Sequence, residues 1–255
     1  MRVVLIGAGR LATHFGKALH RAGHDIVAVY SRQRAHAEAL CQVVGGVPAD
    51  RFEALPMQAD VFVVSLTDQA LQQHVAQFTK GREGQLFVHT AGSVPMDVFQ
   101  GYVQRYGVCY PMQTVSKERE VDFAEIPVFI EGGDPAIRRL AESVSGRVYE
   151  LSSADRQYLH LAAVFACNFA NHCYALSADI LNSHGVPFDV MLPLIDETAR
   201  KVHQLRPRQA QTGPAVRYDR NVMERQMELL PDGQDRLIYE LLSKSIHDRL
   251  QLDKD

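Results

Sequence analysis

The sequence predicts an α/β fold in which a doubly wound, largely parallel sheet is followed by an all-α region. Three observations lead to this prediction. A glycine-rich turn joins an apolar segment to a helical pattern near the N-terminus, short apolar runs alternate with helical patterns up to about residue 150, and only helical patterns follow. We therefore expect a sheet domain over residues 1–151 and an all-helical domain over residues 152–255.

The first predicted strand, residues 2–6, runs into a Gly-x-Gly-x-x-Ala motif, and helical periodicity follows over residues 10–22. Strand, tight turn and helix in this order form a dinucleotide-binding fingerprint. Gly7 would allow the turn, Gly9 would let the backbone approach a pyrophosphate, and Ala12 would keep the helix close to the strand. The unpaired N–H groups at the helix N-terminus would bind the anion. The cofactor-binding residues predicted here are Gly7, Ala8, Gly9, Arg10, Leu11 and Ala12.

The second predicted strand, residues 25–30, lacks the carboxylate that commonly follows it in NAD sites and accepts from the ribose hydroxyls. Ser31 and Arg32 come next, and Arg34 follows. A cation at a helix N-terminus costs roughly 0.3–1 kcal/mol, so Arg10, Arg32 and Arg34 are easier to explain if an anion lies between them. The 2′-phosphate of NADP fits, with Ser31 as a hydroxyl donor. The alternative is that these arginines are simply solvated.

The remaining elements of the sheet domain follow the same alternation. Residues 111–126 are polar and lack a clear period, so we expect a loop there. Further strands are predicted at residues 61–66, 85–89, 106–110, 127–131 and 147–150, and further helices at 33–44, 68–79, 95–105 and 135–144.

The helical domain is predicted to begin with a long helix over residues 154–184. A capping box that starts at Ser152 would open this helix, and Gly185 would close it. A second helix is expected from Pro187, bent or interrupted at Pro193. Shorter helical segments are predicted at residues 219–230 and 234–251.

Composition excludes several classes of function. Hydrophobic residues make up 46% and charged residues 22%, which is ordinary for a globular protein. The net charge of −3 and the lack of a basic run disfavour nucleic acid as a partner. No apolar stretch approaches the ~20 residues of a membrane helix, and no signal peptide is recognised, so we expect a cytoplasmic protein without membrane partners. The four cysteines lack Cys-x-x-Cys spacing, which indicates reduced thiols, and no metal site is expected.

Polar residues follow two neighbouring predicted strands. Ligands of open parallel sheets bind beyond the carboxyl ends of the strands, so Ser65, Leu66, Thr67 and Thr90 are predicted to bind the cofactor. His89 ends the same strand that precedes Thr90. An imidazole beside a nicotinamide could exchange the proton that accompanies hydride transfer. Equally, His89 could be a histidine that is hydrogen-bonded to backbone at a strand end.

The long predicted helix contributes a second group of polar side chains. Asn168 and His172 are four residues apart and therefore share one face, with Asn171 on an adjacent stripe. In an otherwise apolar helix these groups are costly without partners, so we expect them either to contact substrate or to pair across a dimer interface. The backbone N–H groups of residues 90–93 could hold a substrate carboxylate.

A known group of proteins shares these patterns. The segments that carry the resemblance are Gly7–Ala12, Ser31–Arg32, His89–Ser93, Tyr110–Thr114, His160–His172 and Gln211–Ala215. On them the chain resembles the superfamily of pyrroline-5-carboxylate reductase, 3-hydroxyisobutyrate dehydrogenase and ketopantoate reductase. More closely, it resembles a bacterial family of Rossmann-like NADP oxidoreductases whose helical C-terminal domain has no assigned function. The resemblance implies a helical domain that dimerises and closes the substrate cleft.

In related dehydrogenases, the resemblance implies that a Lys or Asn of the long helix contacts the substrate carbonyl or imine. This chain has no lysine between Arg156 and Arg200, so the usual Lys-x-x-x-Asn acid is missing and hydroxyacid oxidation is not favoured. We expect an NADP(H)-dependent oxidoreductase that reduces a small C=O or C=N substrate, with His89, Asn168 and His172 as catalytic candidates. A non-catalytic NADP-binding sensor or assembly module, and a deazaflavin-dependent NADP reductase, remain alternatives.

Overall fold

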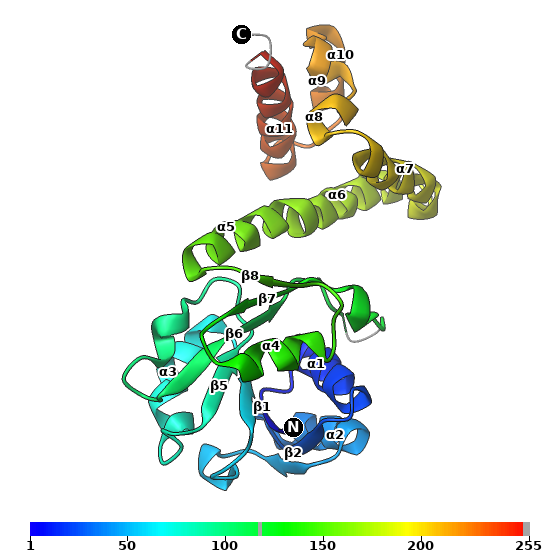
Figure 1. Cartoon of the computed structure of the whole chain (residues 1–255). Coiled ribbons are helices and arrows are strands. Elements are labelled where there is room, and N and C mark those ends of the chain that lie inside the picture. The colour runs from blue at the N-terminus through cyan, green and yellow to red at the C-terminus, as the bar shows by residue number, and fades with distance from the viewer. Residues whose placement is uncertain (117–118, 252–255) are drawn as a thin grey trace. The chain divides into compact units, whose positions relative to one another are not determined.

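The computed structural model describes residues 1–116 and 119–251, and its N-terminal part is built around one eight-stranded sheet (Figure 1). The strand order is β3-β2-β1-β4-β5-β6-β7-β8. Neighbouring strands of this sheet run parallel except for β6 and β7, which are antiparallel. The strands are β1 (Arg2–Ile6), β2 (Asp25–Tyr30), β3 (Val47–Ala49), β4 (Val61–Val64), β5 (Leu86–His89), β6 (Arg105–Pro111), β7 (Val128–Glu131) and β8 (Val148–Glu150).

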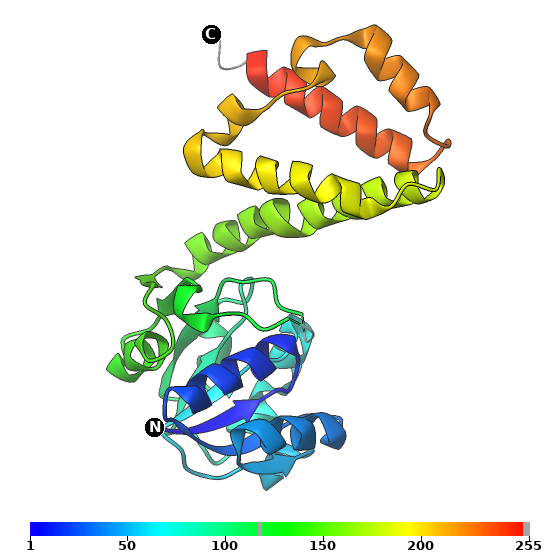
Figure 2. The same ribbon diagram turned by 90° about the vertical axis from the view of Figure 1, so that its right-hand side faces the viewer.

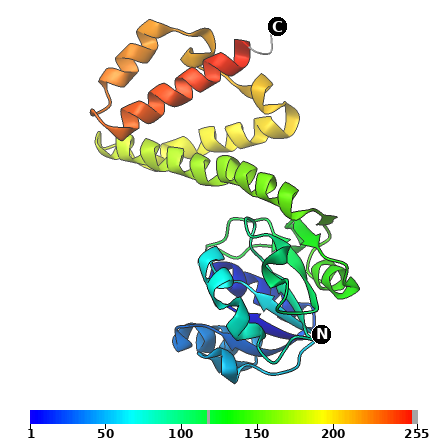
Figure 3. The same ribbon diagram turned by 90° about the vertical axis from the view of Figure 1, so that its left-hand side faces the viewer.

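Helices cover both faces of this sheet. Helices α1 (Arg10–Arg21), α2 (Arg34–Val44) and α4 (Pro135–Glu142) pack on one face, where Figure 2 shows α1 and α2 in blue. Helix α3 (Asp68–Thr79) packs on the other face, which is turned to the viewer in Figure 3. Strands covered in this way bury successive side chains in opposite directions, as expected of parallel sheets. The predicted doubly wound α/β fold is therefore confirmed.

The rest of the chain is helical. Its elements are α5 (Ser153–Ala163), a π-helical segment (Val164–Phe169), α6 (Ala170–Asn182), α7 (Leu192–Gln204), α8 (Pro207–Ala210), α9 (Pro214–Arg217), α10 (Arg220–Glu228) and α11 (Gln234–Gln251). By packing, the chain divides into a sheet unit, Met1–Asn168, and a helical unit that begins at Phe169. Helix α5 thus belongs to the sheet unit. The domain boundary at residue 151 was predicted from where the strand patterns end, and it stays a prediction.

Two expectations for the sheet unit were wrong. The helix predicted over residues 95–105 is only a 3-10 turn, Met96–Phe99, because the left-handed Gly101 (φ 83°) turns the chain before β6 begins. Strand β3 was not predicted, since it has three residues and includes Pro48, too few to show alternation. The loop predicted over 111–126 contains a 3-10 turn at Phe123–Glu125, and its residues 117–118 lie outside the described residues.

Two expectations for the helical region also need correction. The long helix predicted over residues 154–184 is interrupted by the π-helical segment, a feature that frequently marks functional sites. After Pro187 the chain forms a 3-10 turn, Phe188–Met191, and α7 begins only at Leu192. Pro193 therefore lies in the first turn of α7, where its missing N–H has no helical partner to lose.

Candidate functional site

The glycine turn between β1 and α1 has the geometry that a dinucleotide requires. Gly7 adopts φ 125°, and a Cβ at this position would collide with the carbonyl oxygen of Ser65. A Cβ on the exposed Gly9 would meet nothing within 4 Å, so the backbone is open to an approaching ligand there. The turn itself is fixed by the Gly7 N–H, which donates to the carbonyl of Tyr30 at 2.9 Å.

Helix α1 starts in a way that suits an anion. Gly9 is its N-cap and provides no side-chain cap, and the first turn contains no acidic residue. The first N–H groups of a helix have no partner within the helix, and the helix dipole makes this end positive. Ala8 is buried and Arg10 is exposed beside them, so the start of α1 can bind a pyrophosphate.

At the end of β2, the predicted arginines differ in whether they are paired. Arg34 bonds Glu38 at 2.9 Å and lies 3.9 Å from Asp50. Arg32 and Arg10 are exposed and have no hydrogen bond or ion pair within residues 1–116 and 119–249. The N–H of Ser31 donates to Ala49 of β3 at 3.0 Å, which fixes the chain here. Arg10 and Arg32 are therefore available to an anionic ligand, whereas Arg34 is already paired.

The ends of β4 and β5 bring two predicted cofactor residues together. The hydroxyl of the buried Thr90 donates to Ser65 Oγ at 3.0 Å. Thr67 is instead the N-cap of α3, and its Oγ1 accepts from the N–H of Ala70 at 3.3 Å. Leu66, between them, is half-buried. The edge above β4 and β5 thus presents a hydroxyl pair and the start of a helix.

His89 is buried, whereas a side chain that exchanges a proton with a ligand must be accessible to that ligand. Its side chain is fully buried, and Nδ1 accepts from the N–H of Ala91 at 3.2 Å. Burial, reinforced by the positive charge of Arg156, lowers the pKa of His89 to about 4. The imidazole is therefore neutral at pH 7 and shielded from solvent, which favours the interpretation of a histidine bonded to backbone at a strand end.

A buried ion pair that the sequence did not reveal anchors α5 to the sheet. Arg156 is 1% exposed and donates to Glu131 of β7 at 2.5 Å and to the carbonyl of Val94 at 2.6 Å. Ser153 also donates to Glu131, through its N–H at 2.8 Å and its hydroxyl at 2.6 Å. Burial alone would raise the pKa of Glu131, but the bonds from Ser153 and Arg156 outweigh it and lower the pKa. No sequence spacing pairs residues this far apart.

A cavity of about 550 Å³ lies between the end of β6 and helix α5 with the π-helical segment. Tyr110 and His160 line it from the two sides, and Asn168 lines it from the π-helical segment. Asn168 is the one of the three catalytic candidates found in this lining. His172 is exposed on α6, in the helical unit. The sequence favours His160 only as a weaker catalytic candidate at the start of the long helix, and nothing local in it links His160 to Tyr110.

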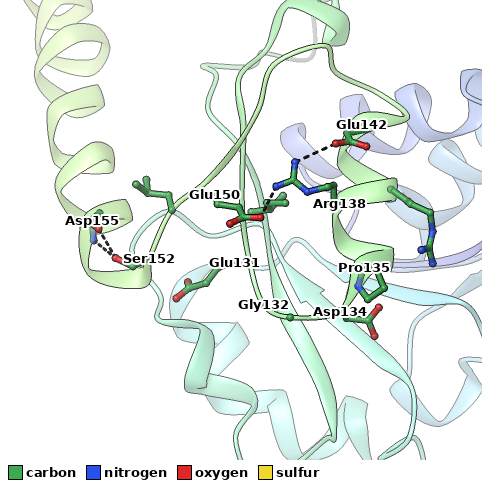
Figure 4. Close-up of a pocket in the computed structure, with 13 residues that line it drawn as sticks. Glu131, Gly132, Asp134, Pro135, Arg138, Glu142, Glu150, Ser152 and Asp155 are labelled. Carbon is green, nitrogen blue, oxygen red and sulfur yellow. Dashed lines mark hydrogen bonds and ion pairs between the residues drawn. The ribbon is translucent and has the colours of Figure 1, made fainter.

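A second cavity, of about 790 Å³, lies where β7, β8 and α4 meet (Figure 4). Most of its charged side chains already have a polar partner, either in the lining or beside it. Arg138 contacts Glu142 at 3.2 Å and Glu150 at 2.5 Å, and Ser152 bonds Asp155 at 2.7 Å. We assign no ligand to this cavity, because these exposed ion pairs account for its composition.

Two other kinds of site are absent from the described residues. The described part of the chain holds no group of three or more His, Cys, Asp or Glu side chains that could bind a metal ion. Nor does any helix in that part combine the length and the apolar character needed to cross a membrane. The cysteines that the structure describes are all free thiols.

Two family models match the sequence. A Rossmann-like domain matches residues 1–113, and a domain of unknown function, DUF2520, matches residues 126–246. No curated protein matches the chain. These two matches confirm the resemblance to a Rossmann-like family with a helical C-terminal domain of unassigned function.

Solved structures that are similar to nearly the whole chain identify its relatives more narrowly than the two family models do. A crystal structure described as a putative NADP oxidoreductase from Bacteroides fragilis is 51% identical, with 97% of this chain and 98% of that chain covered and a TM-score of 0.92. A protein from Thermotoga maritima is 21% identical, with 98% and 99% covered and a TM-score of 0.78. An imine reductase from Myxococcus stipitatus in complex with NADP+ is 19% identical, with 98% and 93% covered and a TM-score of 0.68. The last two show a shared fold. The chain therefore belongs to the family of the Bacteroides fragilis protein and joins a Rossmann-like domain to a DUF2520 domain.

Proposed function

We propose that the chain is an NADP(H)-dependent oxidoreductase that reduces a small C=O or C=N substrate. The observation that carries the proposal is Arg32, an exposed guanidinium without an ion-pair partner among the described residues, at the end of β2 where NAD sites commonly have a carboxylate. A guanidinium matches the geometry of a phosphate, which NADP carries on this ribose and NAD lacks. The name of the Bacteroides fragilis relative supports the same cofactor.

Residues suited to three parts of this cofactor support the proposal. Gly9 and the start of α1 would hold the pyrophosphate, and Ser31, Arg32 and Arg10 would hold the 2′-phosphate. Ser65 and Thr90 would line the nicotinamide half. When bound, the reduced cofactor would supply the hydride, while the protein orients the substrate and provides the proton. Catalytic roles for His89, Asn168 and His172 stay predictions, of which Asn168 is supported by its place in the cavity.

Replacing Arg32 with Ala tests the cofactor. We expect NADPH binding to weaken by about 1.5–3 kcal/mol, the contribution of a hydrogen bond to a charged group, while NADH binding stays unchanged. Arg34→Ala is the matched control, because Arg34 already pairs with Glu38 and its loss should cost NADPH binding less. Titration calorimetry with both nucleotides measures the effect. An equal loss for NADPH and NADH would contradict the proposal.

We also propose that the chain forms a homodimer through its helical unit. Within residues 169–249 only Ala215 and Ser243 are buried, whereas Leu194, Leu237 and Leu241 are 62%, 58% and 66% exposed. Exposed leucines on two helices of one unit are typical of a surface that another chain covers. Sedimentation velocity over a range of protein concentrations tests this, and a monomer at all of them would contradict it. The cytoplasmic location stays a prediction.

A further inference from the structure

Tyr110 and His160 form a hydrogen-bonded pair at the carboxyl edge of the sheet. Tyr110 is the next-to-last residue of β6, is 7% exposed, and its hydroxyl lies 3.1 Å from His160 Nδ1. The two rings meet edge to face at an interplanar angle of 76°. Burial raises the pKa of Tyr110, although the charge of Arg156 partly opposes this. The phenol therefore keeps its proton at neutral pH.

The loop after β5 closes tightly on this pair. A Cβ on Gly92 would lie 2.6 Å from His160 Nδ1 and 3.0 Å from Tyr110 Cζ, so only glycine allows this approach. The loop is also tied to α5, because Arg156 donates to Val94 and Gln157 donates to Ser93. Since β5 and β6 are parallel neighbours, their carboxyl ends share the edge at which the nicotinamide half of a dinucleotide lies.

The cavity beside the pair is mostly apolar. Met112, Leu159 and Ala163 are among its walls, and Asn168 adds a neutral amide. None of the side chains that line it, all within the described residues, is Asp, Glu, Lys or Arg. A substrate carboxylate would leave water here without a cation to pair with, which is costly. An uncharged carbonyl or imine needs only one hydrogen-bond donor, which Tyr110 can provide.

We propose that this cavity is the substrate site, that it takes a small uncharged ketone, aldehyde or imine, and that the Tyr110 hydroxyl donates the proton. The proposal rests on the proposed NADP(H)-dependent reduction. It departs from the sequence-based expectation that residues 90–93 hold a substrate carboxylate.

The transfer balances with the groups present. Hydride from the reduced nicotinamide forms the new C–H bond, and the π electrons of the C=O or C=N bond move onto the oxygen or nitrogen. That atom takes the Tyr110 proton, and the electron pair of the broken O–H bond stays on the phenolic oxygen. The phenolic oxygen regains a proton from solvent along its hydrogen bond to the half-buried His160. His160 thus acts through Tyr110 as a positioning residue.

Turnover tests the role of Tyr110. The full chain with NADPH should reduce cyclopentanone or a cyclic imine of similar size faster than 2-oxopentanoate. Tyr110→Phe should lower kcat by about 100-fold or more, the usual contribution of a general acid, with KM and NADPH binding close to wild type. Tyr106→Phe is the matched control, because Tyr106 lies on the same strand and its hydroxyl has no hydrogen bond in the described structure. His160→Gln should lower kcat without changing KM.

A binding experiment does not depend on turnover. Ligand-observed NMR should detect cyclopentanone on the wild-type chain and a loss of binding of about 10-fold or more in Ala163→Phe, which fills the cavity. The exposed Ala154, also on α5, gives the control variant Ala154→Phe. The inference fails if NADPH binds but Tyr110→Phe turns over as the wild type does, or if 2-oxopentanoate competes equally for the cavity. Failure of NADPH to bind would instead overturn the proposed function.

Discussion

The two units of the chain bury their side chains to very different extents. In the sheet unit, two apolar clusters fill the spaces above and below the strands, and residues such as Phe15 and Phe87 are fully buried. In the described residues of the helical unit, helices α9, α10 and α11 contact one another, yet almost every large apolar side chain stays partly exposed. The sheet unit therefore has a core of its own, whereas the helical unit leaves apolar surface available.

This difference separates stability that comes from burial within one chain from stability that needs a second surface. Buried apolar area contributes about 25 cal/mol per Å², and in the sheet unit the chain itself supplies both surfaces. The exposed leucines of α11 gain the same contribution only if a second surface covers them. Stability of the sheet unit should therefore be independent of protein concentration, and stability of the helical unit should rise with it.

The largest expected effect contrasts one side chain from each unit. Phe87→Ala removes a fully buried ring whose centroid lies 4.6 Å from that of Phe62, and it should cost about 3–5 kcal/mol of unfolding free energy. Leu241→Ala truncates a side chain that is 66% exposed in the single chain. If the helical unit dimerises, this substitution lowers the unfolding midpoint more at high than at low protein concentration. Urea denaturation at two concentrations measures both effects.

A concentration-dependent loss for Phe87→Ala, or none for Leu241→Ala, would remove the distinction between the two units.

Arg156→Leu should have an effect of similar size within the sheet unit. It leaves the Glu131 carboxylate without its cation and the Val94 carbonyl without its donor. Removing one partner of a buried ion pair costs about 3–5 kcal/mol. The same change should release the loop at residues 91–94, which hydrogen exchange of its amides would detect. Unchanged exchange together with unchanged stability would show that the pair does not anchor α5.

Acid should destabilise the sheet unit through His89. Its pKa is about 4 in the folded chain and 6.5 for an unperturbed histidine, so between these values the unfolded state binds a proton that the native state does not. Stability is therefore lost as the pH falls through this window, by up to about 3 kcal/mol at its lower end. His89→Phe should flatten the curve of unfolding free energy between pH 7 and pH 5, above the range in which carboxylates titrate. A slope that does not decrease in this variant would assign the loss to other groups, such as the buried His24, whose pKa burial also lowers.

The smallest effect is expected at the exposed ion pairs of the second cavity. Arg138 is 43% exposed and contacts Glu142 and Glu150 across solvent. Such pairs are screened by water and salt, so Arg138→Ala should leave the thermal midpoint unchanged at physiological ionic strength. It also serves as the matched control for Arg156→Leu. A large loss would show that this surface network is structural.

Much of the sheet unit could be predicted because its signals are local. Alternation of apolar runs and helical periods gives the order of elements, and Gly7 with Gly9 marks the first turn, since both depend on neighbours in the chain. The identities of Ser31 and Arg32 likewise predict the chemistry of the ribose site. Short or irregular elements, such as β3 and the 3-10 turn after Pro95, carry too few residues to show a period.

The sequence by itself determined the fold class, and it predicts the place of the nucleotide and the phosphate contact, because each depends on residues close together in the chain. Only the tertiary structure decided which polar side chains meet. Tyr110 and His160 are 50 residues apart, and Glu131 and Arg156 are 25 apart. It also decided that His89 is buried, because the depth of a strand end depends on the elements packed around it. Pairing across a fold follows from packing, and no local pattern encodes it.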